Sequence, residues 1–227
     1  MSQASASPSR GGVIFDMDGL MLDTESIAKT AWERAFAQTG HELTPEMFGR
    51  MIGRNKRDCA ELLREWFGAE FDFTTTYHEC GRIYEELVAQ QGLPLKPGVM
   101  ELLRELAARG VPLAVATSTR QPKAQQRLTQ AGLLGFFAVV VAGDEVENGK
   151  PAPDIYLEAA RRLGIDPARS FALEDSHAGV RAAHAAGLKV IMVPDLLPAT
   201  GEIEKLTHRV VPSLDEVLAV LDEFTRG

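Results

Sequence analysis

The chain is poor in residues that could cross-link it or bind a metal through sulfur. Among its 227 residues are only two cysteines, Cys59 and Cys80, which lack the paired spacing of a zinc site. A disulfide-stapled secreted domain is therefore a poor interpretation, and a reducing cytoplasm is the expected location. The polar first residues, MSQASASPSRGG, have no apolar core of the kind that a secretory signal needs. We expect residues 1–11 to form a flexible N-terminal tail.

Long hydrophobic runs and an excess of positive charge are also absent. No apolar run is longer than a β-strand, so no membrane-spanning helix is predicted. The formal net charge of −8 argues against partners such as nucleic acid or an anionic membrane surface. Hydrophobic residues make up 45% and charged residues 25%, a balance typical of a soluble chain that can build a large core. Nothing in the sequence demands an oligomer, and we expect a monomer.

What the chain does have is a series of short, continuous apolar runs rich in β-forming residues. Runs that are continuous rather than alternating are typical of strands buried on both faces of a parallel sheet. The six predicted strands are residues 12–17, 112–118, 137–143, 170–175, 189–194 and 209–212. Helix-like segments separate the later ones, for example 99–110 and 153–164. Strand–helix alternation predicts an α/β fold with a doubly wound, Rossmann-like parallel sheet.

One long stretch interrupts this alternation. Residues 24–96 contain no convincing strand, but segments 25–40, 57–68 and 74–92 have the amphipathic pattern of helices. We therefore expect an α/β core made of residues 12–23 and 97–227, with an all-helical cap inserted at 24–96. The insertion follows the carboxyl end of the first strand, where open α/β sheets bind ligands. Its position is that of a lid.

Polar residues that could carry chemistry follow several predicted strands. Carboxyl ends of parallel strands meet at one edge of a doubly wound sheet, so these residues are expected to converge. The set comprises Asp16, Asp18, Thr117, Ser118, Glu174 and Asp175, with Lys150 in a loop. Clustered carboxylates repel one another, and a hard cation such as Mg²⁺ is their natural neutraliser. A lysine and a hydroxyl beside that ion would cradle a phosphoryl group.

These motifs resemble the four ordered motifs of the haloacid dehalogenase-like (HAD) hydrolases. They read Asp16-Met17-Asp18-Gly19, Thr117-Ser118, Lys150-Pro151 and Glu174-Asp175-Ser176. The stretches KPAPDIYLEAARRLGI and LEDSHAGVRAAHAAGLKVIMV are similar to the branch that holds β-phosphoglucomutase and small sugar-phosphate phosphatases. The resemblance covers almost the whole chain from Gly12 onward. A lone DxD pattern would be weak, whereas four motifs in order are specific.

The resemblance implies a role for each motif residue. Asp16 would be the nucleophile that forms an aspartyl-phosphate. Asp18 would be the general acid and base, and would lend its backbone carbonyl to Mg²⁺. Asp16 and Asp175 would bind Mg²⁺ through their carboxylates, and Glu174 either directly or through water. The residues expected to bind the phosphoryl group are Thr117, Lys150 and the backbone N–H of Ser118.

Substrate choice is expected to depend on the cap. The segment GRNKRD, residues 53–58, resembles the substrate-specificity loop of the family. Arg54 and Lys56 would there meet a polar or anionic substrate, although a solvated basic turn explains the same residues equally well. The expected partner is a small phosphorylated metabolite.

Four functions compete at this point. A Mg²⁺-dependent phosphatase acting on a small phosphomonoester, such as a sugar phosphate, fits best. The alternative is a phosphosugar mutase, but such mutases carry a histidine and an arginine where this chain has Ala28 and Lys56. Halide-removing relatives lack a second aspartate, so Asp18 argues against that activity. A non-enzymatic aspartate phosphorylation switch is the fourth, and such receiver domains are shorter and have no helical insertion.

Overall fold

The computed structural model describes residues 10–51 and 56–225, and these fall into two compact units. One unit, the core, takes in the chain up to Asp23 and from Pro94 onward; the other, the helical unit, is Thr24–Leu93. Arg54, one of the two predicted specificity residues, lies outside the described residues. Lys56 is described only as the first residue of a helix.

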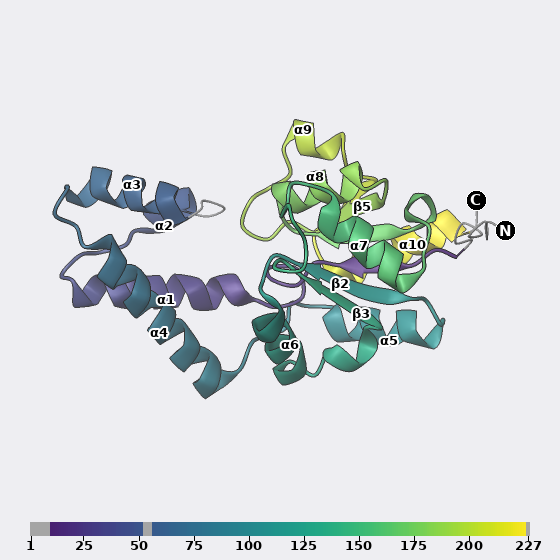
Figure 1. The fold of residues 1–227 in the computed structure, drawn as a ribbon, viewed down its shortest axis with the longest axis horizontal. Helices are drawn as coiled ribbons and strands as arrows, with labels where there is room; N and C mark the ends of the chain where they lie inside the picture. The colour runs from purple at the N-terminus through teal and green to yellow at the C-terminus, as the bar shows by residue number, and fades with distance from the viewer. Residues whose placement is uncertain (1–9, 52–55, 226–227) are drawn as a thin grey trace. The chain divides into compact units, whose positions relative to one another are not determined.

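The core is built on a six-stranded parallel sheet with the strand order β3-β2-β1-β4-β5-β6 (Figure 1). The strands are β1 Val13–Phe15, β2 Leu113–Thr117, β3 Val139–Ala142, β4 Phe171–Glu174, β5 Lys189–Met192 and β6 Arg209–Val210. Each lies inside one of the six predicted runs. This arrangement confirms the predicted α/β class with a doubly wound, Rossmann-like sheet. The chain order reverses between β1 and β4, which is where such sheets open a crevice for ligands.

Helices cover both faces of this sheet, α7 and α8 on one side and α5 on the other (Figure 1). Their residue ranges are α5 Val99–Ala108, α6 Gln121–Gln130, α7 Asp154–Leu163, α8 His177–Ala185, α9 Gly201–Glu204 and α10 Val217–Thr225. Three short 3₁₀ turns add η1 Leu134–Phe136, η2 Pro167–Arg169 and η3 Leu214–Glu216. Ile14, Ala114 and Ala172 point to the face where α7 and α8 pack, and all three are fully buried. Burial of this kind supplies most of the free energy that holds the layers together.

The helical unit contains α1 Thr24–Gln38, α2 Pro45–Met51, α3 Lys56–Phe67 and α4 Phe73–Gln91. Its described residues include no strand. The short α2 is not among the predicted helices. The hydrophobic core of the helical unit is rich in aromatic residues. The ring of Phe36 stacks on that of Phe71 with centroids 5.6 Å apart, and the ring centroid of Phe67 lies 5.4 Å from that of Phe36. In the described part of the chain, no helix has the length and apolar character needed to cross a membrane.

Two short segments connect the helical unit to the core, and within the core they pair with each other. The backbone N–H of Asp23 donates to the carbonyl of Pro94 at 2.9 Å, and that of Lys96 donates to Met21 at 2.9 Å. Leu22 and Leu95 form an antiparallel bridge between these bonds. The insertion therefore leaves and re-enters the core at a single place, next to the end of β1.

Candidate active site

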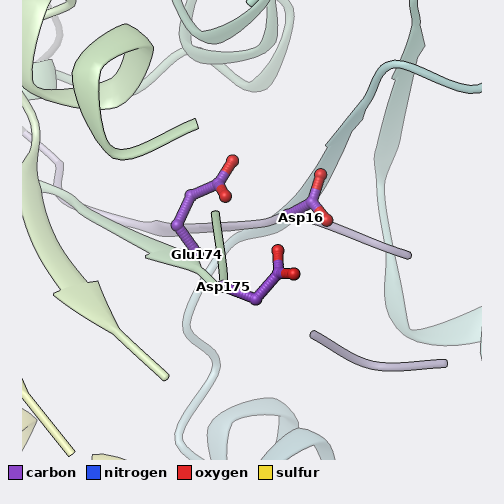
Figure 2. A group of neighbouring side chains, drawn as sticks. All are labelled: Asp16, Glu174 and Asp175. Carbon is purple, nitrogen blue, oxygen red and sulfur yellow. The ribbon is translucent and has the colours of Figure 1, made fainter. Parts of the chain in front are cut away.

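The site begins with three carboxylates at the ends of β1 and β4, here called the acidic triad: Asp16, Glu174 and Asp175. Phe15 is the register partner of Leu173, so the residues that follow the two strands come level with each other. One oxygen from each carboxylate lies within 4.8 Å of the others, and Figure 2 shows the three side chains gathered at the strand ends. The predicted convergence of these residues is thus present at the switch point of the sheet.

Lys150 connects two members of the acidic triad. Its ammonium donates to Asp16 Oδ1 at 2.5 Å, to Glu174 Oε1 at 2.6 Å and to the Ala116 carbonyl at 3.0 Å. Only 6% of the side chain is exposed. Burial disfavours the charged ammonium, but the two carboxylates outweigh it and raise the pKa of Lys150 above its usual value. Lys150 is consequently a fixed positive charge beside Asp16.

Glu174 is fully occupied by protein donors. Its Oε1 accepts from Lys150 and from the buried Tyr156 hydroxyl at 2.5 Å. Its Oε2 accepts from the Ser176 backbone N–H at 3.3 Å and the Ser176 hydroxyl at 3.1 Å. A carboxylate offers about four acceptor positions, so Glu174 has none left for a direct metal bond in this arrangement. Gly179 makes room for it, since a Cβ there would lie 1.8 Å from Glu174 Oε1.

Asp16 and Asp175 are the members of the triad whose negative charge is disfavoured by their surroundings. Burial raises the pKa of Asp16 to about 7, against the opposing charge of Lys150 and with added repulsion from Glu174. Burial, followed by the charges of Asp16 and Glu174, raises the pKa of Asp175 well above its usual value. A divalent cation would remove this repulsion, and an all-oxygen donor set suits Mg²⁺. The residues present therefore fit the metal that the family resemblance implies.

Asp18 has a different set of partners. Its Oδ1 accepts from Arg127 Nη1 at 2.6 Å, and its Oδ2 accepts from the Thr119 hydroxyl at 2.6 Å. The Thr117 hydroxyl is 3.5 Å from the same Oδ2. The carboxylate of Asp18 is thus held apart from the triad by the segment after β2 and by α6. That the backbone carbonyl of Asp18 binds Mg²⁺ stays a prediction.

Thr117 and Ser118 lie where the sequence predicts, at the carboxyl end of β2. Thr117 is buried, and its hydroxyl accepts from the Thr119 backbone N–H at 3.1 Å. Ser118 is exposed, and the chain after β3 packs directly on it: a Cβ on Gly143 would lie 2.4 Å from the Ser118 carbonyl oxygen. Their predicted contacts with a phosphoryl group stay predictions.

Sequence reasoning missed Thr119, Arg127 and Tyr156. Thr119 stands next to the predicted Thr117-Ser118 pair, so its position was a usable signal. Arg127 is one of several polar residues on α6, and Tyr156 is one apolar position on α7. Nothing in the local pattern distinguishes either of them from ordinary helix residues.

Comparison with known proteins places this geometry in a family. The family described as haloacid dehalogenase-like hydrolase matches residues 13–193. The chain belongs to this family. It is 36% identical over 183 residues to the phosphorylated carbohydrates phosphatase of Thermotoga maritima, covering 79% of this chain and 82% of that protein. It is 34% identical over 221 residues to (DL)-glycerol-3-phosphatase 1 of Arabidopsis thaliana, covering 93% of this chain and 70% of that protein.

Solved structures give the same result. A protein of Thermotoga maritima described as a candidate β-phosphoglucomutase matches with a TM-score of 0.81 and 32% identity, covering 94% of this chain and 99% of that chain. The expected resemblance to the HAD hydrolases and to their β-phosphoglucomutase-like branch is confirmed by these matches.

Proposed function

We propose that the chain is a Mg²⁺-dependent phosphatase that hydrolyses a small phosphomonoester through an aspartyl-phosphate. As a member of the HAD hydrolases with several relatives that are phosphatases by name, it is a phosphoric monoester hydrolase. The observation that carries the mechanism is the pairing of Asp16 with Lys150 at 2.5 Å beside Asp175. A carboxylate held by a lysine within an acidic group supports attack by Asp16 on phosphorus.

The proposed reaction has two balanced steps. In the first, an Asp16 oxygen bonds to phosphorus, the bond from phosphorus to the substrate oxygen breaks, and Asp18 gives that oxygen a proton. In the second, water attacks the same phosphorus, Asp18 takes a proton from the water, and the bond to Asp16 breaks. The products are an alcohol, inorganic phosphate and the original enzyme.

The remaining site residues would bind the metal and the phosphoryl group and offset the charge of that group. Mg²⁺ would be held by Asp16, Asp175 and the Asp18 carbonyl, and would offset the charge of the transferring phosphoryl group. Lys150 would donate to the same phosphoryl group, as would Thr117 and the Ser118 backbone N–H. Glu174 would act through Lys150, because its own acceptor positions are occupied.

The substrate we propose is a sugar phosphate or a related small metabolite. Two relatives of nearly equal identity are named for different phosphates, so similarity alone does not choose among them. We assign the choice to the helical unit, with Arg54 and Lys56 as the candidate contacts and with the unit acting as a lid. Cys59 and Cys80 are both buried and neither forms a disulfide, which supports the predicted cytoplasmic location. A monomer is retained as a prediction.

The proposal is tested by measuring phosphate release from a panel of phosphorylated metabolites and p-nitrophenyl phosphate. We expect turnover with Mg²⁺, its loss when EDTA is added, and its return when Mg²⁺ is supplied in excess. Chromatography of the products separates hydrolysis from isomerisation, which returns a phosphorylated isomer and no free phosphate. Undiminished activity in metal-free buffer would refute the metal dependence, and an isomer as the main product would favour the mutase.

Arg127→Met is expected to slow reactions that need a protonated leaving group. Arg127 fixes Oδ1 of Asp18, while the Thr119 hydroxyl at Oδ2 can either donate or accept and so tolerates both protonation states. General acid catalysis is worth roughly 10²–10⁴-fold, and we expect loss of the fixed orientation to cost at least tenfold in kcat/KM for an alkyl phosphate. For 2,4-dinitrophenyl phosphate, whose leaving group needs no proton, the expected change is less than about threefold.

The matched control for this variant is Arg162→Met, which removes an arginine paired with Glu145 and Glu158 on the outer side of α7. It should alter neither substrate's kcat/KM. If Arg127→Met reduced kcat/KM equally for both substrates, Arg127 would act on the phosphoryl group or on folding instead of on Asp18.

A further inference from the structure

Asp195, in the loop after β5, has a buried carboxylate oxygen that accepts no hydrogen bond from the protein. Its Oδ2 is the one buried side-chain oxygen or nitrogen in residues 10–51 and 56–225 to which no protein group donates. The side chain is 10% exposed, and its Oδ1 accepts from the Lys96 ammonium at 2.6 Å. Buried carboxylate oxygens are rarely left without a donor, because the lost hydration is costly. The unpaired oxygen therefore needs an explanation.

The direction of Asp195 Oδ2 supplies one. A Cβ placed on Gly19 would lie 2.3 Å from Asp175 Oδ2 and 3.4 Å from Asp195 Oδ2. Both oxygens thus approach the same point beside the backbone of Gly19, whose φ of +85° also favours glycine there. The separation of the two oxygens cannot exceed the sum of those two distances, so a single water molecule can reach both of them. Asp195 Oδ2 consequently lies close to Asp175, one member of the acidic triad.

Asp195 is nevertheless not a member of the triad. The group of carboxylate oxygens within 4.8 Å of one another contains only Asp16, Glu174 and Asp175 in the described part of the chain. Mg²⁺ loses its water molecules reluctantly and usually keeps several of them in a protein site. Side chains that accept hydrogen bonds from such water orient the site, and their loss typically weakens metal binding by 10–100-fold.

Lys96 and its backbone explain how Asp195 keeps this direction. The ammonium of Lys96 takes up Oδ1, which leaves Oδ2 for a second donor. The backbone N–H of Lys96 donates to the Met21 carbonyl at 2.9 Å, two residues after Gly19. The ion pair is therefore anchored to the same loop that carries Asp16 and Asp18.

We propose that Asp195, oriented by Lys96, accepts a hydrogen bond from a water molecule in the hydration shell of the divalent metal held by Asp16 and Asp175. Asp195 is a positioning residue: it strengthens metal binding without touching the metal or the substrate. This inference rests on the metal site of the proposed function. It adds a residue outside the four motifs to that site.

The test is the metal affinity of the protein in the absence of substrate. Metal-free wild-type protein and Asp195→Asn are titrated with Mg²⁺ by calorimetry and with Mn²⁺ by electron paramagnetic resonance. The amide can still accept from Lys96, but it then turns its NH₂ toward the water, so we expect affinity to fall about tenfold. The control is Asp222→Asn, which removes the same charge from an ion pair with Arg109. Its affinity should stay within about twofold of wild type, and thermal unfolding verifies that both variants are folded.

A crystal structure of the wild-type protein with Mn²⁺ gives a second answer that does not depend on any variant. It should contain a metal-bound water within hydrogen-bonding distance of Asp195 Oδ2, and the absence of such a water would overturn the inference. Unchanged metal affinity in folded Asp195→Asn would also overturn it, while the proposed function would stand. Wild-type protein that binds no divalent metal would overturn both.

Discussion

Asp16→Asn is expected to lower kcat/KM by about 10⁴-fold or more while the protein stays folded, by analogy with nucleophile deletions in other covalent mechanisms. The amide has nearly the shape of the carboxylate and its oxygen can still accept from Lys150. It has no negative oxygen with which to attack phosphorus. Because the pKa of Asp16 is raised to about 7 by burial, a neutral side chain is well tolerated at this position.

The decisive measurement for Asp16 is mass spectrometry of protein quenched in acid during turnover. Wild-type protein should gain the mass of one phosphoryl group, located by peptide mapping to the segment that contains Asp16, and Asp16→Asn should gain none. Asp222→Asn serves again as the control, because it removes one carboxylate from an ion pair with Arg109 that includes no site residue. Near-normal turnover of Asp16→Asn would exclude Asp16 as the nucleophile.

Lys150→Met should lower kcat about a hundredfold, the usual effect of removing one donor aimed at developing negative charge. The structure adds a second consequence. The ammonium bridges Asp16 and Glu174, which are both buried, and removing one partner of a buried ion pair costs about 3 kcal/mol or more. We therefore expect both slower catalysis and a lower melting temperature.

The loss of stability in Lys150→Met should depend on pH and on metal. The pKa of Asp16 is already raised to about 7 by burial, and without Lys150 it rises further. An acid whose pKa is raised by folding destabilises the protein as pH increases from its unfolded pKa through its folded pKa. The variant should therefore be least stable relative to wild type above pH 7, and Mg²⁺ should recover part of the difference.

A matched control for Lys150 is Lys189→Met, which removes a lysine whose ammonium donates to the Ala168 carbonyl. Urea unfolding at several pH values and steady-state kinetics cover both effects. A change in kcat of less than about threefold for Lys150→Met would mean that Lys150 makes no contact with the transferred group.

The strands and the acidic triad were predictable for a physical reason. The central strands β1, β2 and β4 are buried at every residue, and they appear as continuous runs because strands buried on both faces are mostly apolar. Adjacent parallel strands end at one edge, so Asp16 and Glu174 must meet once β1 and β4 are neighbours. Local sequence is sufficient in these cases because backbone register, rather than side-chain rotamers, brings the groups together.

The side-chain contacts that surround the acidic triad and Asp18 were not predictable from the sequence. Arg127 and Asp195 lie in a helix and a loop whose patterns allow an exposed charge, and only the packed fold turns them toward Asp18 and Gly19. The saturation of Glu174 by Tyr156 and Ser176 likewise depends on where α7 lies against β4. The short α2 was missed because seven residues carry little helical periodicity.

The two segments that connect the helical unit to the core pair with each other, so the distance between the ends of the insertion is fixed by the core. A backbone hydrogen bond joins Asp23 to Pro94, and Leu22 and Leu95 form an antiparallel bridge. The chain segments on either side of the helical unit are therefore paired within the core, like the two strands of a hairpin. Exchanging one insertion for another would leave the distance between these ends unchanged, and the entropy of loop closure varies only slowly with loop length. Such a junction should tolerate insertions of different length without disturbing the backbone that carries Asp16 and Asp18.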